Sequence, residues 1–395
     1  MNAGDSIAAR MLVRGTARAA VLLGALAFVP AASAHGGGDV SIGGIVVHQW
    51  YALVPLLVGI AAVVASASLP RLLRPEYAHY GLYGVAAGLV VAVVGAIGLV
   101  QLSPYEWFTT QPPIPRALHD PLMLLAGLLI ALGSAVVGRL HWPRRPRYAG
   151  LGILLGLWVA YPGFAVLGVY TETNPLGYLI VLALPLALGY VLWRDARGVF
   201  GQLRADRTAT RFGIGVGLLG VVFFLFSTGM VTVVPDDGVG LSWSQGFVRS
   251  FPVLGPLVVW PALEVWMPSV PFSGMLSVGT VVLVGTLGAL IGLNAALVAS
   301  RWLKATASET SGSTAGVVGI AAPQACCCCG PLLSQVGVVV LGPSLGAPLY
   351  LLFADPSSSI GSLFFVASVA VLTAVVIRAG RSPPSPSADE CALPA

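Results

Sequence analysis

Charged residues are scarce in this chain. Of its 395 residues only 9% are Asp, Glu, Lys or Arg, whereas an average soluble domain carries roughly 25%. Hydrophobic residues make up 57%, so too few charges remain to cover a soluble particle of this size. The shortage excludes a soluble globular enzyme and a disordered chain, and five cysteines are too few for a disulfide scaffold. The composition indicates an integral membrane protein.

Chemical signatures are also few. The sequence contains neither G-x-x-x-x-G-K-[ST] nor a G-x-G-x-x-G that follows a strand, so it gives no sign of a nucleotide site. Ionisable residues are almost absent from the apolar runs, where Asn294 is among the few polar side chains. Proton-driven pumps generally need buried Asp, Glu or His. No nucleophile and base can be paired, so the sequence does not predict an enzyme. A basic surface interleaved with aromatics is missing too, which argues against a nucleic-acid partner.

Apolar runs long enough to cross a bilayer recur along the chain, since a spanning helix needs about 20 residues. Backbone polar groups in lipid must be satisfied within the segment, so each run is expected to be a helix. We predict an all-α, polytopic membrane bundle over residues 35–380, surrounded by the lipid bilayer. The nine predicted spans are 46–68, 80–101, 119–138, 148–170, 174–193, 212–234, 273–300, 315–342 and 360–378.

The first 34 residues have the pattern of a secretory signal peptide. A basic start is followed by an apolar stretch and by Ala32-Ser33-Ala34, a small-residue cleavage site. An uncleaved anchor is the alternative, and both versions place residue 35 outside. At the other end, residues 381–395 are rich in Pro and Ser and are expected to form a disordered cytoplasmic tail.

Basic residues fall in every second connection between the predicted spans, and so on one side of the bundle. Fifteen Arg and Lys fall in connections on one side, and only Arg116 and Arg249 fall on the other. Because translocating basic loops is unfavourable, the rich side is expected to be cytoplasmic. The protein is then expected in the cytoplasmic membrane, with its mature amino terminus outside and its carboxyl terminus inside. The fifteen are Arg71, Arg74, Arg139, Arg144, Arg145, Arg147, Arg194, Arg197, Arg204, Arg207, Arg211, Arg301, Lys304, Arg378 and Arg381.

Residues 235–272 fit no full span, because a crossing there would break the alternation of the arginines. The stretch 251–270 is apolar, interrupted by prolines, and contains Glu264. We expect an interfacial or re-entrant piece shielded by protein, with a full span as the alternative. The sequence shows no convincing internal repeat. The openings "HQWYALVPLL" at His48 and "HDPLMLLAGL" at His119 are alike, but the likeness is too short to argue a duplication.

Cys326, Cys327, Cys328 and Cys329 are consecutive, and the only other cysteine is Cys391. At a rise of about 1.5 Å per residue, the run would lie near the middle of the predicted span 315–342. Successive side chains on a helix turn by about 100°, so this segment alone is not expected to build a four-thiolate site. Two thiolates suffice for a soft cation such as Cu(I) or Hg(II). Small buried hydrophobes and a redox-active vicinal pair are the alternatives.

The segment "ACCCCGPLLSQVGVVVLG" resembles the first membrane helix of mercuric-ion transport proteins, in which a vicinal cysteine pair precedes small and Leu-rich residues. In that family the pair takes the metal from an outer partner and passes it inward. The resemblance covers about 20 residues, and it implies metal passage through Cys326 to Cys329. Four cysteines stand here in place of two, and the family members are far smaller.

Nitrogen and carboxylate ligands lie toward the predicted outer side. Cleavage after the signal would make His35 the amino terminus, where amine and imidazole together chelate Cu(II). His48 and His119 each open a span, and Asp120 follows His119, so these residues would gather a metal outside. A rival interpretation assigns the histidines to two b-type haems. It uses His48 and His119 at one level, and His79 and His141 at the other.

We therefore predict a multi-pass membrane protein that handles or transports a soft metal ion, copper first. Its predicted partners are an extracytoplasmic metal carrier or other membrane subunits. The alternatives are a non-catalytic structural or assembly subunit of a membrane complex, and a haem-binding membrane electron carrier. The predicted metal ligands are Cys326, Cys327, Cys328, Cys329, His35, His48, His119 and Asp120.

Overall fold

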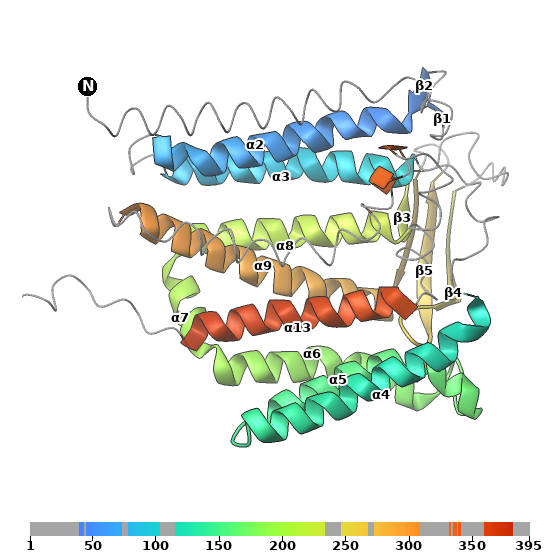
Figure 1. Ribbon diagram of the computed structural model, residues 1–395. Helices are drawn as coiled ribbons and strands as arrows, with labels where there is room; N and C mark the ends of the chain where they lie inside the picture. Colours follow the sequence, from blue (N-terminus) through green and yellow to red (C-terminus); the bar gives the residue numbers. More distant parts are fainter. Residues whose placement is uncertain are drawn as a thin grey trace, which may run out of the picture.

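A computed structural model shows a bundle of long helices with a small sheet at one end (Figure 1). It describes residues 39–42, 45–72, 78–102, 115–233, 246–267, 272–307, 332, 335–337, 339–340 and 359–381. Eight helices in this part of the chain are long and apolar enough to cross a membrane. They coincide with eight of the nine predicted spans, so the all-α bundle is confirmed. Most of the ninth span, 315–342, lies outside the described residues, as do the predicted signal at 1–34 and residues 382–395 of the tail.

The helices follow the apolar runs, and short polar or Pro-containing connections end them. Two short 3-10 helices, η2 (Gln49–Ala52) and η5 (Phe164–Leu167), lie at the start of α2 and the end of α5. The α-helices are α2 (Leu53–Leu72), α3 (Ala78–Gln101), α4 (Arg116–His141), α5 (Pro146–Gly163), α6 (Pro175–Asp195), α7 (Arg197–Ala205), α8 (Arg207–Ser227), α9 (Val278–Ala307) and α13 (Ser359–Arg381).

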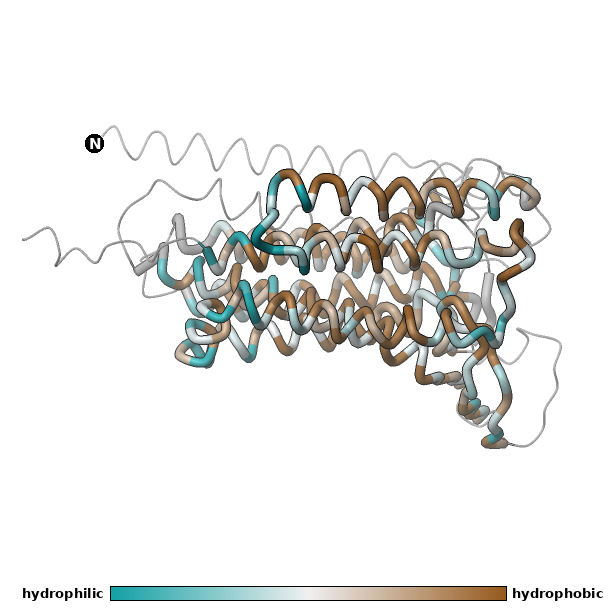
Figure 2. The backbone as a smooth tube through the Cα atoms, turned by 90° about the horizontal axis from the view of Figure 1, so that it is seen from below, coloured by the Kyte–Doolittle hydropathy of each residue, from teal (hydrophilic) through white to brown (hydrophobic). Residues whose placement is uncertain are grey.

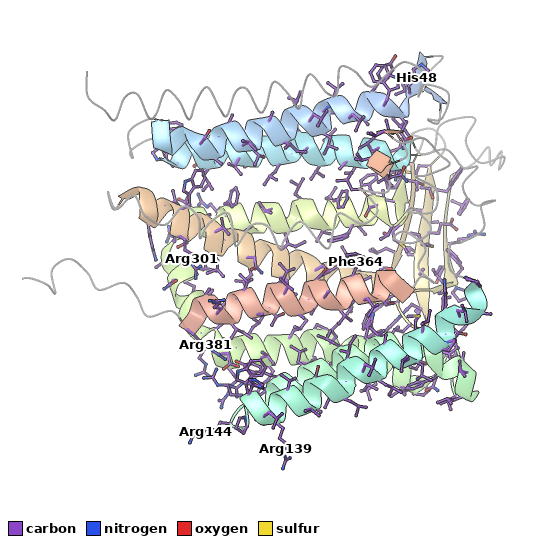
Figure 3. All side chains as sticks on the ribbon, in the orientation of Figure 1. His48, Arg139, Arg144, Arg301, Phe364 and Arg381 are labelled. Atoms are coloured by element: carbon purple, nitrogen blue, oxygen red, sulfur yellow. The ribbon has the colours of Figure 1, made fainter. Side chains whose placement is uncertain are left out.

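The bundle has two chemically different ends. Arg139, Arg144, Arg301 and Arg381 lie together at one end, which we call the arginine end, and His48 lies at the other (Figure 3). Figure 2 shows hydrophilic residues gathered most clearly toward the arginine end, with apolar residues along the helices between. Large apolar side chains such as Leu132, 63% exposed, lie on the outside of the helices. This surface suits a lipid bilayer, in which exposed apolar side chains are not destabilising.

A four-stranded antiparallel sheet lies at the opposite end, which we call the sheet end. Its order is β3-β6-β5-β4. The strands are β3 (Val231–Thr232), β4 (Phe247–Leu254), β5 (Val259–Met267) and β6 (Phe272–Ser277). A separate hairpin of β1 (Asp39–Ile42) and β2 (Ile45–His48) precedes η2.

Residues 251–267, the described part of the predicted interfacial or re-entrant stretch 251–270, lie in β4, β5 and the turn between them. The strands correct the alternatives of a full span and of a re-entrant helix. Residues alternate between two faces along β5, with Trp260 and Ala262 buried and Pro261 and Leu263 exposed. The prolines that break the helical pattern occupy positions whose backbone nitrogen need not donate to a neighbouring strand, which proline cannot do. Pro252 lies on the edge strand β4, and Pro261 lies one position beyond the last β5–β6 pair, Ala262 with Ser277.

Glycines bring the helices of two hairpins into direct backbone contact. A Cβ added to Gly59 in α2 would lie 2.3 Å from the backbone nitrogen of Ala92 in α3. One added to Gly127 in α4 would lie 2.3 Å from the backbone nitrogen of Ala160 in α5. Only glycine permits such an approach, which is how membrane helices pack most closely.

These two hairpins are an internal repeat with an offset of 68 residues. Sixteen of the 47 residues from 53 to 99 are identical to the residue 68 positions later. The close contacts of the glycines repeat as well. In the first hairpin they join Gly84 to Ser66, Gly88 to Val63 and Gly95 to Leu56. The equivalent contacts in the second hairpin join Gly152 to Ser134, Gly156 to Ala131 and Gly163 to Leu124. We call α2–α3 the first hairpin and α4–α5 the second. Both start at the sheet end, as in a parallel repeat.

The prediction that the chain has no convincing repeat was therefore wrong. It compared His48 with His119, which are 71 positions apart. In the true register His119 corresponds to Tyr51, and His48 corresponds to Arg116. The repeat is carried by glycines and small residues at the helix contacts.

Candidate metal site

The predicted thiolate ligands and the predicted amino-terminal ligand cannot be placed. Cys326, Cys327, Cys328, Cys329 and His35 lie outside the described residues. The chain is described again at Leu332, three residues after Cys329, and then at 335–337 and 339–340.

His48 lies at the sheet end of the first hairpin, where β2 ends and η2 begins. Its ring is half-buried and meets the Tyr51 ring edge-on, with centroids 5.4 Å apart. The next residue, Gln49, is fully buried. His48 is therefore held between a surface aromatic and a buried amide.

His119 and Asp120 lie in the first turn of α4, on the second hairpin. The His119 side chain is buried at 7% exposure, and Asp120 is half-buried. The start of α4 and the strand β2 lie on opposite sides of the bundle (Figure 1). The structure thus brings His119 and Asp120 together but leaves His48 apart from both. In the described part of the chain no group of three or more His, Cys, Asp or Glu could hold a metal ion.

The histidines do not form the pairs that two haems would need. His48 and His119 belong to different hairpins on opposite sides of the bundle. His79 begins α3 and His141 ends α4, and both are exposed. Axial imidazoles must face each other across one iron, and these positions provide no such arrangement.

The chain that follows the cysteines packs into the bundle at the sheet end of the first hairpin. Val339 is buried there with Ala52, Leu99 and Phe223, so α2, α3 and α8 all contribute. We call this group the Gln49 cluster. Its members are Gln49, Ala52, Leu56, Ala96, Leu99, Phe223, Leu332, Gln335, Val336 and Val339.

Two glutamine amides meet inside the Gln49 cluster. The Nε2 of Gln49 donates to the Oε1 of Gln335 over 2.9 Å and to the carbonyl of Leu99 over 2.7 Å. Both glutamines have 0% exposure. Among the described residues, the Oε1 of Gln49 and the Nε2 of Gln335 have no hydrogen-bond partner. Sequence reasoning missed this contact because the two residues are 286 positions apart.

A third glutamine joins the first hairpin to the sheet. The Nε2 of Gln101, at the end of α3, donates to the carbonyls of Phe226 and Val231, and its Oε1 accepts from the backbone of Val233. Every described bond of this amide goes to backbone groups where α8 continues into β3. Gln101 therefore has a structural role, unlike the incompletely bonded pair.

Two tyrosines join the same sheet to the chain that follows the second hairpin: Tyr170 lies between η5 and α6, and Tyr178 lies in α6. The hydroxyl of Tyr170 donates to the carbonyl of Leu257 over 3.4 Å, and that of Tyr178 donates to the carbonyl of Val259 over 2.5 Å. Leu257, at the β4–β5 turn, has a positive φ of 68°, a conformation unusual for a side chain of this kind. Burial, together with the charges of Glu172 and Asp120, raises the pKa of Tyr170. The sheet thus contacts the end of the first hairpin, through Gln101, and the chain that follows the second hairpin.

The arginine end contains an ion pair that sequence reasoning also missed. Arg147 at the start of α5 contacts Asp195 at the end of α6 through two hydrogen bonds. Tyr148 accepts a hydrogen bond from Arg381 of α13 beside it. The only sequence signal was an acid among the arginines of that side.

Comparisons with known proteins do not assign this chain. No protein-family model, curated protein or solved structure matches it. The function must therefore be argued from the residues of the chain itself.

Proposed function

We propose that this membrane protein handles or transports a soft metal ion, Cu(I) first, through Cys326 to Cys329. The observation that carries the proposal is the cysteine run itself: four adjacent thiols in a chain with a single other cysteine. Thiolates select soft cations such as Cu(I), which accepts two-coordinate binding. A metal held by two thiolates can pass to a neighbouring pair by exchange of one ligand at a time.

The described neighbourhood supports this proposal. Three residues after the run, Leu332 is half-buried and packs against the Gln49 cluster. His48 adjoins the same cluster through Gln49. We therefore favour His48 as the histidine that meets the metal first. His119 and Asp120, on the other hairpin, would gather cations separately, and His35 stays a proposed amino-terminal ligand.

Orientation follows from the separation of charges. The arginine end would face the cytoplasm, because basic loops are retained there, and the sheet end would face outward in the cytoplasmic membrane. An extracytoplasmic metal carrier would then approach the sheet end. A reporter enzyme fused after Arg381 should show activity on the cytoplasmic side of the membrane. Activity on the outer side would show that the orientation is the reverse.

The experiment that tests the function measures copper per chain. The protein is purified in detergent under reducing conditions, loaded with Cu(I), freed of excess metal and subjected to elemental analysis. The variant with all four cysteines changed to Ser should lose the bound copper, and Cys326→Ser/Cys329→Ser should lose it too. The control Cys391→Ser should keep it. Equal copper in the parent and the four-serine variant would overturn the proposal.

One observation favours a second candidate, a structural or assembly subunit of a larger membrane complex. One face of the sheet exposes a row of apolar side chains, including Val248 at 65%, Leu254 at 56% and Leu263 at 52%. Exposed apolar groups of this kind often mark protein interfaces. Leu263→Ser should then release a co-purifying subunit without unfolding the chain. If the parent purifies alone and binds copper, this candidate fails.

A further inference from the structure

The contact between Gln49 and Gln335 is more polar than its surroundings require. Both side chains lie at 0% exposure among Ala52, Leu99 and Val339. Within the part of the chain that the structure describes, the acceptor Oε1 of Gln49 and the donor Nε2 of Gln335 have no hydrogen-bond partner. Apolar side chains of similar size would remove both unpaired amide atoms, although the carbonyl of Leu99 would then lose the donor that Gln49 supplies. The pair is therefore expected to add little to stability.

The helical hairpin itself does not need this pair. In the repeat register Gln49 corresponds to Ala117, and Leu99 corresponds to Leu167. The second hairpin therefore packs its two helices through the same glycine contacts with alanine at the position of Gln49. What differs is the segment packed against each hairpin. Only the first hairpin meets Gln335, which lies six residues after Cys329.

Apolar contacts and hydrogen bonds constrain a packed segment differently. Leu332, Val336 and Val339 contact the cluster through apolar surface, which tolerates sliding along the helices. A buried polar group tolerates little, because a shift would leave further amide atoms without partners. A single buried amide can fix the register of packed helices in this way, at some expense of stability.

The orientation of the amides is determined by their neighbours. Gln49 must turn its Nε2 toward the carbonyl of Leu99, because its own oxygen would be repelled there. Gln335 must then present Oε1 to that nitrogen. Leu99 lies in the last turn of α3, so Gln335 has one compatible position relative to the first hairpin.

We propose that the Gln49–Gln335 pair sets the register in which the segment containing Leu332, Gln335, Val336 and Val339 packs against the first hairpin. Because Gln335 lies only six residues after Cys329, a change in this register should change the reactivity of the cysteines. These are positioning residues and do not themselves bind the metal. The role of this register in metal binding rests on the proposed function. The register itself can be tested without metal.

The test measures alkylation of the cysteines by N-ethylmaleimide in the purified full chain, in a Cys391→Ser background without metal. In the Gln49→Leu/Gln335→Leu variant, which replaces the pair with apolar side chains, the cysteines should be alkylated about tenfold faster, while the melting temperature stays close to that of the parent. Gln335→Met, which keeps the length of the side chain, should act in the same direction. The control Gln101→Leu removes a structural amide at the same end, so it should lower the melting temperature and leave alkylation unchanged.

Alkylation of the double variant at the parent rate would overturn the inference. A faster rate accompanied by a lower melting temperature would do so as well, because general loosening would then explain it. Copper loading separates the two proposals. If the parent binds no copper but the double variant alkylates faster, the proposed function fails and the register role stands. If copper binds through the cysteines and alkylation does not change, the function stands and the register role fails.

Discussion

Arg147 holds Asp195 by two hydrogen bonds: Nε donates to Oδ2 and Nη2 donates to Oδ1, each over 2.6 Å. A two-point contact between planar groups fixes orientation as well as distance. The Asp195 side chain is only 4% exposed, and Arg145 lies 3.5 Å from it. The pair joins the second hairpin to α6 at the arginine end, so this end of the bundle is held by ionic contacts and the sheet end by hydrogen bonds to strands.

Arg147→Ala should destabilise the protein markedly, because it leaves Asp195 buried without its main partner. Breaking a fully buried pair costs roughly 3–5 kcal/mol. With Arg147 still 20% exposed, about 2 kcal/mol is expected once solvent screening is allowed for. Thermal unfolding in detergent measures the change. Arg144→Ala, which removes an exposed arginine from the same connection, should melt like the parent, and equal losses in both variants would show that the pair has no special role.

The repeat predicts that equivalent glycines respond alike. Gly59→Val and Gly127→Val should each disrupt a hairpin, because the added atoms meet backbone 2.3 Å away and the helices cannot separate without losing their contact. A loss above about 3 kcal/mol is expected for such overpacking. The fraction of monodisperse protein after size-exclusion chromatography reports the outcome. Gly133→Ala is the control, since a Cβ there meets nothing within 4 Å. Tolerance of valine at either Gly59 or Gly127 would contradict the proposed equivalence.

The sequence predicted the parts of the fold that depend on local composition. Span positions and the gathering of arginines at one end follow from hydropathy and loop charge. The structure confirms eight of the nine spans and the gathering of arginines. The sheet was missed because its prolines obscured the alternation along 247–267. The contact of Gln49 with Gln335 and that of Arg147 with Asp195 join residues 286 and 48 positions apart. Nothing in local sequence indicates such pairings, and the metal ligands stay predictions because the cysteines lie outside the described residues.

Because the pKa of Tyr170 is raised in the folded protein, we expect the protein to lose stability in strong alkali. Burial and the nearby carboxylates of Glu172 and Asp120 raise the pKa of Tyr170 in the folded protein. In the unfolded chain a tyrosine has a pKa of about 10. Unfolded chains therefore release the proton first, and the free energy of unfolding falls as pH rises above that value. Tyr170→Phe should show a shallower decline in stability above about pH 10 in denaturation curves. Tyr83→Phe, at a 63% exposed position, should decline like the parent. If the stability of Tyr170→Phe fell with pH as steeply as that of the parent, groups other than Tyr170 would account for the alkaline loss of stability.

The separation of the histidines predicts unequal roles in copper binding. His48 precedes Gln49, which contacts Gln335 on the chain that follows the cysteines, while His119 lies on the second hairpin. His48→Ala should therefore weaken Cu(I) binding about tenfold, the scale expected when a group beside a metal site is removed. His119→Ala should change the affinity less than about twofold, below that scale. Competition with a chromophoric Cu(I) chelator at fixed pH measures both affinities. Equal weakening would mean that the two hairpins serve one site, and a larger effect of His119→Ala would move the entry point for the metal to the second hairpin.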